Sequence, residues 1–555
     1  MKKNSRQSSL DQTLKPIKYS RKVPIILLGL LLFIYVVLVT ISSSDQYLTF
    51  NFKGLIDQKD NQTATELNHS SESIKLTGSS ESSESHLKEA EVKFKKLFEN
   101  FDEKSIVGAK IEPSSQIQSN LNTQPSTTSN STKKCPKLNK PTDLNIIDIY
   151  WQVTSTSNGT FYLYNAYYDD RISLMGPPVV RILGFIDVLF PKVKTFCQFW
   201  YANLVEPVIT EVYEYRYIWY LGWGENKKGA TPYLISCLSP LPEAPKYVSI
   251  VEHKCDQANN LLEVKNKRPK IKEKFIVSVK KLDYVQDISM QIIEWCEIIK
   301  ILGANKVEFS VLNVHNNVMD VLRFYEAEGF ANVKLIKYPS SLPEKDNWHQ
   351  RMQNELIAYH DTFYENLYSY DFVLPMDTDE FIIPLRPEDN NWADLLNRTA
   401  WKALEQHKFA DSFQVDNHYF LLKTPFNNFT SIPGIPQNLY FLSNIFRAAN
   451  FTPNGGNAKT FLRTDRVLTI HNHFPFSCID NSNKNWCENF KVAREDGQLS
   501  HYRHECSTDE CKESLLHPVG DTTLYKYKDQ IIIGMGEAIR KLKIFTNGKI
   551  NLNLG

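Results

Sequence analysis

Strand-like and helix-like segments alternate between residues 274 and 376, and this alternation restricts the chain to few folds. Asp287 and Gly303 are placed to begin and end the first of the helices. Because strands that alternate with helices pair in parallel, we expect an α/β fold with a mostly parallel sheet and helices on both faces. The expected strands are 274–282, 306–314, 332–338 and 371–376, and the expected helices are 287–303, 317–329 and 349–368.

Three acidic residues follow the last of these strands. Asp377, Asp379 and Glu380 stand between the apolar runs 372–376 and 381–383. Ligands of open parallel sheets bind beyond the carboxyl ends of the strands. Two carboxylates one residue apart can bind one Mg²⁺ or Mn²⁺ together with substrate phosphates, whereas without a metal they would repel each other and raise a pKa. The simpler alternative is a solvated turn.

Residues 23–41 form an uncharged apolar run. As a helix it would be about 28 Å long, which is close to the hydrocarbon thickness of a bilayer. Basic residues precede it, so residues 1–22 are expected in the cytoplasm. A cleaved signal peptide is the alternative, but the length of the run and the lack of a small-residue cleavage site before Ser42 favour an uncleaved signal anchor.

Residues 42–140 are rich in Ser, Thr, Asn, Gln and Glu, which predicts a largely disordered lumenal stem. Within it, residues 86–101 have helical spacing and would form a short surface helix or a stalk coiled coil. Residues 141–555 would then be one lumenal domain. Glycosylation sequons fit this topology and begin at Asn61, Asn68, Asn130, Asn158, Asn397, Asn428 and Asn450.

The cysteines also indicate an oxidising compartment. Cys478, Cys487, Cys506 and Cys511 lie close together in a polar region, which favours disulfides whose connectivity the sequence leaves open. The chain has nine cysteines, so at least one is unpaired, and Cys296 on an amphipathic helix is the candidate for a buried thiol. The net charge of +1 gives no basic field for nucleic acid.

Two reaction classes place Asp-x-Asp after a strand. Haloacid-dehalogenase-like phosphatases use the first Asp as a nucleophile, but they favour Thr or Val where this chain has Phe381, and their motif normally opens the domain. Transferases that use sugar nucleotides bind a divalent cation there, and the cation offsets charge on the departing diphosphate. The anchor, the stem and the sequons favour the transferase.

Several segments of the chain resemble glycosyltransferase family 92, a family that contains galactosyltransferases. The most specific one is "AYHDTFYENLYSYDFVLPMDTDEFIIP", residues 358–384, in which His360 and Thr362 replace the Asn and Cys that often flank the residue matching Asp361. The other resembling segments are "SCLSPLPEAPKYVSIV", "IIEWCEIIKILGANKVEFSV", "VMDVLRFYEAEG", "AKTFLRTDRVLTIHNH" and "LSHYR".

This resemblance implies a GT-A-like, Rossmann-like fold and an inverting transfer. It implies a hexose donor, UDP-galactose by default, a glycan or glycoprotein acceptor, and Mn²⁺ or Mg²⁺ as the cofactor. Together with the anchor, it implies a single-pass type II Golgi membrane protein. The alternative is a catalytically inactive lumenal protein that binds glycans or acts in adhesion. The oligomeric state is left open, with a homodimer as one option.

Several further residues are candidates for the site. The fold implies a third metal ligand downstream, for which His471 is the first choice and His473 the second. Donor-binding candidates are Asp361, Glu380, Lys459, His501 and Arg503. Asp361 could instead orient the site from behind or face solvent, Lys459 could be a surface side chain, and His501 and Arg503 could instead contact the acceptor or only border a strand.

An inverting transferase also needs a general base for the acceptor hydroxyl. Glu495 and Asp496, just before Gly497, are weak candidates, with an exposed turn as the plainer interpretation.

Overall fold

The computed structural model describes residues 135, 137–138, 144, 150–171, 177–342, 344, 347–422, 432–436, 439–479, 487–503 and 517–542. The chain divides into two compact units, 1–128 and 129–555, and every described residue lies in the second. Within these residues no helix is long and apolar enough to cross a membrane. The predicted tail, anchor and 86–101 helix lie outside them, as do nearly all of the stem, Asn61, Asn68, Asn130, Asn428, Cys506 and Cys511.

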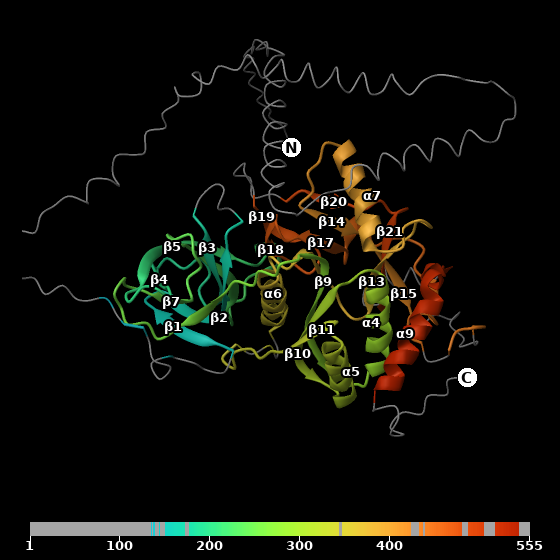
Figure 1. Ribbon diagram of the computed structural model, residues 1–555, viewed down its shortest axis with the longest axis horizontal. Coiled ribbons are helices and arrows are strands. Elements are labelled where there is room, and N and C mark those ends of the chain that lie inside the picture. Colours follow the sequence, from blue (N-terminus) through green and yellow to red (C-terminus); the bar gives the residue numbers. More distant parts are fainter. Residues whose placement is uncertain are drawn as a thin grey trace, which may run out of the picture. The chain divides into compact units, whose positions relative to one another are not determined.

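An eight-stranded sheet that the sequence did not predict comes first in the chain (Figure 1). Its pairs are antiparallel except for β2–β8, and β8 pairs with both β7 and β2, so the sheet closes on itself. In sheet order, the strands are β1 (Gln152–Thr156), β2 (Gly159–Asp169), β3 (Val179–Ile186), β6 (Thr231–Leu238), β5 (Val208–Tyr217), β4 (Phe196–Trp200), β7 (Tyr247–Val251) and β8 (Leu262–Lys265).

A seven-stranded sheet contains the predicted βαβ units. All of its strands except β17 run in one direction, so the expectation of a mostly parallel sheet fits this sheet but not the chain as a whole, whose sheets are mixed. In sheet order, the strands are β11 (Ala331–Leu335), β10 (Lys306–Val314), β9 (Glu273–Tyr284), β12 (Tyr370–Pro375), β17 (Lys459–Arg463), β14 (Ser412–Val415) and β20 (Asn489–Lys491).

Helices cover both faces of this second sheet, as the sequence predicts. Along β9, Phe275 and Val277 pack into one core with the helices α4 (Ser289–Ile301), α5 (Asn316–Ala327), α7 (Trp392–Glu405) and α9 (Lys528–Lys541). Ile276 points to the other face and packs with α6 (Trp348–Glu365). That second core also contains Tyr167 and Leu183, so α6 lies between the two sheets (Figure 1).

A five-stranded sheet follows, in which β13 leaves the acidic segment and pairs with β21. In sheet order, its strands are β13 (Glu380–Pro384), β21 (Gly497–Arg503), β15 (Asn417–Leu421), β16 (Phe446–Arg447) and β22 (Val519–Gly520). The remaining elements are the hairpin β18 (Val467–Ile470) and β19 (Pro475–Cys478), and the short 3-10 helices η4 (Leu221–Trp223), η5 (Pro453–Gly455) and η6 (Thr523–Tyr527).

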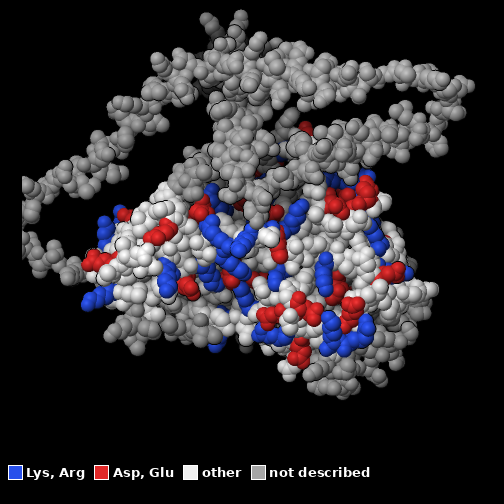
Figure 2. Space-filling view, in the orientation of Figure 1, with Lys and Arg blue, Asp and Glu red and all other residues white. Residues whose placement is uncertain are grey.

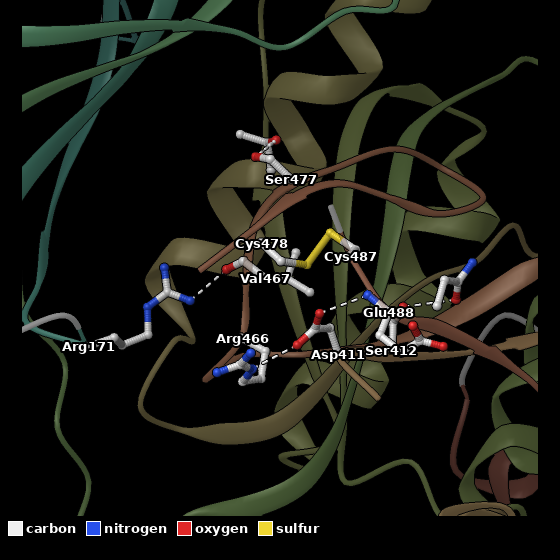
Figure 3. The surroundings of a disulfide bond; sticks show 11 residues. Arg171, Asp411, Ser412, Arg466, Val467, Ser477, Cys478, Cys487 and Glu488 are labelled. Atoms are coloured by element: carbon white, nitrogen blue, oxygen red, sulfur yellow. Dashed lines mark hydrogen bonds and ion pairs between the residues drawn. A yellow bond between two sulfur atoms is a disulfide. The ribbon is translucent and has the colours of Figure 1, made fainter. Parts of the chain in front are cut away.

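Disulfides join Cys478 to Cys487, Cys197 to Cys237 and Cys135 to Cys255. The first confirms part of the predicted disulfide region, and Cys296 is a buried free thiol, as predicted. Figure 3 shows the surroundings of Cys478 and Cys487. There, Asp411 accepts hydrogen bonds from Arg466 Nε (2.7 Å) and from the backbone N–H of Glu488 (2.9 Å).

The guanidinium of Arg171, just after β2, connects the first sheet to this region. Arg171 donates to the carbonyl oxygen of Val467 over 2.6 Å, and Asp169 holds the guanidinium from behind at 2.8 Å (Figure 3). A hydrogen bond of Arg171 therefore joins the end of β2 to β18, in addition to the apolar core around α6.

Three of the predicted glycosylation sites are described. Asn397 on α7 and Asn450 are exposed, whereas Asn158 is half-buried and its side chain accepts a hydrogen bond from the Lys192 backbone at 2.7 Å. On the face drawn in Figure 2, acidic and basic side chains are interspersed, with a group of basic ones near the middle.

Candidate functional site

A pocket of about 420 Å³ opens at the carboxyl ends of β9 and β12. Its volume falls in the range usual for small-molecule sites. Residues of the first sheet's loops, of α6 and of the acidic segment all line it. They are Trp219, Trp223, Lys280, Trp348, Met352, Glu355, Leu356, Tyr359, Asp377, Glu380, Asn457, His471, Asn472, His473, His501 and Arg503.

Asp377 lies between two lysines. The parallel register pairs Pro375, the last residue of β12, with Ser278, and two residues further along β9 this register brings Lys280 beside Asp377. The Nζ atom of Lys280 is 3.5 Å from Oδ1 of Asp377, and the Nζ atom of Lys459 is 3.6 Å from its Oδ2. Lys280 also pairs with Glu355 on α6 at 3.1 Å.

Glu380 and Lys459 form a buried pair behind this carboxylate. Lys459 Nζ lies 2.7 Å from Oε1 of Glu380, and both side chains are almost fully buried. The same Oε1 accepts a hydrogen bond from the backbone N–H of Asp377 (2.9 Å), so Glu380 fixes the turn that carries the acids. The Lys459 ammonium also donates to Oδ1 of Asn472. Lys459 is therefore a buried component of the site rather than a surface side chain.

Asp379 lies beside His501 on the neighbouring strand. Antiparallel pairing of β13 and β21 sets Glu380 opposite His501. His501 Nε2 is 3.5 Å from Oδ2 of Asp379, and its Nδ1 is 3.3 Å from Oε2 of Glu380. Arg503 Nε lies 3.3 Å from His501 Nε2, and both residues line the pocket.

Lys280 and Lys459 change the pKa shift that the sequence predicts for the acidic residues. Burial alone would raise the pKa of Asp377, but Lys280 and Lys459 outweigh it and hold this pKa below its usual value. For Glu380 burial prevails over Lys459 and His501, so its pKa is raised. The expected repulsion between carboxylates is thus offset at Asp377 by two ammonium groups that the sequence argument did not include.

His471 and His473 both line the pocket, on the turn between β18 and β19. Burial and the nearby Lys459 lower the pKa of His473 to about 3, and burial together with His473 lowers the pKa of His471. His473 Nδ1 lies 2.8 Å from the carbonyl oxygen of Ala458, and the His471 ring lies against Trp223 with centroids 4.8 Å apart. Both imidazoles are therefore neutral at physiological pH.

The donor set suits a hard cation only in part. Asp377 lines the pocket and its side chain is 22% exposed, so it can present an oxygen there. Asp379 is 36% exposed and lies beside the pocket-lining His501, but it does not itself line the pocket. This fits a cation that takes one or two carboxylates and completes its shell with phosphates and water. Among the described residues, no group of three or more His, Cys, Asp or Glu side chains could hold a metal ion. The assignment of Asp377, Asp379 and His471 as ligands stays a prediction.

Asp361 does not lie in the pocket. Its carboxylate accepts hydrogen bonds from Asn165 (2.8 Å), Lys334 (2.8 Å) and the Tyr167 hydroxyl, and it is 3% exposed. Lys265 lies 3.7 Å away. The expectation that it binds the donor is corrected: all of these partners are protein groups, and they join α6 to the first sheet and to β11.

Glu495 and Asp496 are also misplaced for the role of general base. They precede Gly497, which pairs with Pro384, while His501 pairs with Glu380 four positions along the same two strands. That separation is about 14 Å. Asp496 is also fully buried against Arg386 (2.8 Å), and Glu495 is an exposed partner of the same arginine. Both acids interact with Arg386 at the far end of the paired strands β13 and β21.

The sequence analysis missed Lys280, Glu355 and the tryptophans of the pocket. A signal existed for Lys280, because a lysine at the end of a strand parallel to β12 must come near Asp377. Nothing distinguished Glu355 from other acids in a helix. Trp219 and Trp223 come from the first sheet, which the sequence did not predict.

Residues 273–533 match the profile of glycosyltransferase family 92. No curated protein matches the chain. Two solved structures show weak similarity. S. aureus TarS 1-349 has 12% identity and a TM-score of 0.20, covering 51% of this chain and 76% of its own. The iron-containing heptosyltransferase TibC in complex with ADP-D-β-D-heptose has 9% identity and a TM-score of 0.12, covering 34% of this chain and 39% of its own. Such low TM-scores support no conclusion about fold or function.

Most of the residues that line the pocket lie within the matched range, and the matched family is one of sugar-transferring enzymes. Residues 273–533 are a glycosyltransferase family 92 domain, which confirms the resemblance found in the sequence. Membership implies transferase activity with a nucleotide-sugar donor. The first sheet, residues 152–265, lies outside the match.

Proposed function

We propose that this protein transfers a hexose, with inversion, from a uridine diphosphate sugar to a glycan in the pocket around Asp377. UDP-galactose is the proposed donor, because the family resemblance indicates galactose. The observation that carries the proposal is the pair of lysines at 3.5 and 3.6 Å from Asp377, at the carboxyl ends of parallel strands within the family domain.

The lysines suit a diphosphate because it carries negative charge that grows as the sugar leaves. Lys280 and Lys459 are held by acids within the pocket wall, so their ammonium groups are positioned before any donor binds. Fixed positive charges of this kind stabilise charge that develops in the transition state. Arg503, on the pocket lining, is a third cation within the same site.

A divalent cation, Mn²⁺ or Mg²⁺, is proposed to bind Asp377 and Asp379. When bound, it would offset the charge of the leaving diphosphate. The chain contributes the turn that holds these carboxylates. Glu380 fixes that turn from behind through the Asp377 backbone N–H, and the Tyr502 backbone N–H holds the Asp379 carbonyl at 2.8 Å.

Glu355 is the proposed group that takes the proton of the acceptor hydroxyl. It lines the pocket, its side chain is 12% exposed, and Lys280 holds it 3.1 Å away. Burial raises the pKa of Glu355 although Lys280 opposes the shift. A carboxylate with a raised pKa is a stronger base, as general-base catalysis requires.

The proposed location is the Golgi membrane, with a type II anchor at residues 23–41 and a lumenal catalytic domain. The apolar run, the polar stem and the three disulfides support it. Enzymatic deglycosylation of the cell-expressed protein should reduce its mass, and among the described residues Asn397 and Asn450 are exposed acceptors. An unchanged mass would contradict a lumenal domain.

The test of the activity uses the full-length protein in detergent. It is incubated over a glycan array with UDP-galactose, UDP-glucose, UDP-N-acetylglucosamine or UDP-N-acetylgalactosamine, with Mn²⁺ or with a chelator. Galactose transfer that the chelator abolishes supports the proposal. Glycan binding without transfer or hydrolysis of any donor would favour the inactive glycan-binding alternative and overturn it. Transfer that persists in chelator would overturn the role of the metal.

A further inference from the structure

The pocket is charged at one end and aromatic at the other, and α6 runs along both. Its pocket-lining residues Trp348, Met352, Glu355 and Tyr359 recur at spacings of three and four and therefore share one helix face. Glu355 pairs with Lys280 at the charged end. Trp348 lies seven residues earlier, which is about 10 Å along the helix axis. The charged end and the aromatic end of the pocket are therefore separated by about the distance from Glu355 to Trp348 along α6.

Three tryptophans form the aromatic end. The ring centroid of Trp219 is 5.1 Å from that of Trp223 and 6.2 Å from that of Trp348. Trp219 is buried, and its Nε1 donates to the Gly224 carbonyl oxygen over 2.8 Å, so it forms the base of the group. Trp348 is 49% exposed although its ring is among the largest apolar surfaces a side chain can have.

Trp223 is held in place from two sides. Its carbonyl oxygen lies 3.1 Å from Nε2 of His349, and its ring packs against His471 with centroids 4.8 Å apart. The loop that carries it is therefore fixed to both α6 and the β18–β19 turn. Rigid, partly exposed aromatic rings in a concave site are typical of ligand contacts rather than of a residual core.

The ligand group that binds at the aromatic end must be complementary to uncharged, flat side chains. Of the residues that line the pocket, the three tryptophans and Met352, one turn of α6 after Trp348, are at this end, and none of them is charged. A sugar ring offers an apolar C–H face to an indole and hydroxyl groups at its edge. A charged group, such as a phosphate or a sialic acid carboxylate, would lose water there without gaining a partner.

We propose that Trp219, Trp223 and Trp348 form the subsite for a neutral sugar ring of the acceptor glycan. This inference rests on the proposed function, because an acceptor must reach the donor sugar, and the aromatic end adjoins the charged end in the same pocket. Trp219 and Trp223 come from the first sheet, outside the family domain. The N-terminal sheet therefore takes part in selecting the acceptor, together with Trp348 from the family domain.

A second cavity lies against Trp219. It has a volume of about 160 Å³, shares Trp219 with the first pocket, and is lined also by Asn226, Glu225 and Lys227. Its polar groups can hydrogen-bond hydroxyls, so a glycan longer than one sugar would extend over it. The acceptor class is thus an oligosaccharide with a neutral terminal sugar.

The test compares Trp348→Ala with Trp401→Ala in the full-length protein. Trp401 lies on α7, is 41% exposed and does not line the pocket, so it is a matched control. We expect Trp348→Ala to raise the KM for a neutral glycan acceptor at least tenfold, with the KM for UDP-galactose unchanged. Trp348→Tyr should recover most of the loss, because it restores a flat ring. An unchanged acceptor KM in Trp348→Ala would overturn the inference.

Binding without a donor separates this inference from the proposed activity. The protein is applied to a glycan array that carries neutral N-glycans and their sialylated forms. We expect binding to the neutral set, lost in Trp348→Ala and kept in Trp401→Ala. This result would hold even if no donor were turned over, in which case only the proposed transfer fails. Preference for sialylated glycans, or equal binding by both variants, would overturn the subsite.

Discussion

Lys280 on β9 and Asp377 just after the parallel neighbouring strand β12 lie side by side, with Nζ 3.5 Å from Oδ1. Lys459 lies 3.6 Å from the other oxygen of the same carboxylate. Two ammonium groups thus flank one carboxylate at the edge of the sheet. The pKa of Asp377 is therefore lowered, whereas its acidic neighbours alone would raise it.

Replacing Asp377 by Ala should lower the stability of the protein. The substitution leaves Lys280 with Glu355 alone and Lys459 with Glu380 alone, so we expect a loss of about 1–3 kcal/mol in the free energy of unfolding. Asp379→Ala is the matched comparison. Asp379 is 36% exposed and its ion pair with His501 has a distance of 3.5 Å. Because such an exposed pair contributes little, replacing Asp379 should lower the free energy of unfolding by less than about 1 kcal/mol. Denaturant unfolding of both variants measures this, and a gain in stability for Asp377→Ala would contradict the lysine clamp.

Both of these variants should lose activity together. Each removes one of the two carboxylates proposed to bind the cation, and loss of one group that stabilises the transition state commonly costs about 100- to 1000-fold in turnover. Chelation of the unmodified protein should produce a similar loss that Mn²⁺ reverses. Turnover of the double alanine variant at the original rate would show that the acids form only a solvated turn.

Lys459→Met should be more destabilising than Lys280→Met. Lys459 is 1% exposed and pairs with Glu380, which has no exposed side-chain surface, so its loss leaves a buried carboxylate short of a partner. Breaking a buried pair from one side costs about 3–5 kcal/mol. Lys280 is 24% exposed and water can reach its partners, so its removal should cost less. Adding Glu380→Gln to Lys459→Met should recover part of the loss, and no recovery would contradict this account.

The disulfide between Cys478 and Cys487 should survive in the native protein, and Cys296 should not react. Peptide mapping without reduction is expected to recover the 478–487 link, while alkylation of Cys296 should require unfolding, since it is fully buried. Replacing Cys487 by Ser should cost about 2–3 kcal/mol, because the bridge closes a short loop in the unfolded chain. Rapid alkylation of Cys478 in the folded protein would contradict the pairing.

Glu294 should make the stability depend on pH. It is fully buried on α4, and burial raises its pKa to about 7 even though the backbone N–H groups of Phe441 and Leu442 donate to it. Between about pH 4.5 and 7 the folded state keeps a proton that the unfolded state has lost. Stability should therefore fall as pH rises through this window, by up to about 1.4 kcal/mol per pH unit, and then level off.

Glu294→Gln should remove this decline, whatever its effect on the absolute stability, because the amide does not titrate. Glu405→Gln is the control, since Glu405 is exposed at the end of α7. Denaturant midpoints measured from pH 4.5 to pH 8 provide the comparison. If the denaturant midpoint fell with pH by the same amount in the wild type and in Glu294→Gln, Glu294 would be ionised throughout this pH range, which would contradict the prediction.

Sequence alone identified the elements whose signals are local. The strands β9, β10 and β12 and the helices α4, α5 and α6 follow from hydrophobic periodicity, and each begins and ends within a few residues of the predicted bounds. The acids at 377, 379 and 380 were identified for the same reason, since the sheet edge follows from the strand that precedes them. The buried thiol of Cys296 follows from its place among apolar side chains on α4.

Tertiary structure decided which distant residues meet. Lys280 and Lys459 are 179 positions apart in the chain, yet both flank Asp377, and Trp223 reaches the same pocket from a sheet that the family match does not include. Tertiary structure also removed two candidate residues. Asp361, a candidate for donor binding, is buried against the first sheet. Asp496, a candidate for the general base, pairs with Arg386 at the far end of the paired strands β13 and β21. Residue type and spacing report local geometry, whereas the charge balance and the shape of a pocket depend on strand register and on packing between distant segments.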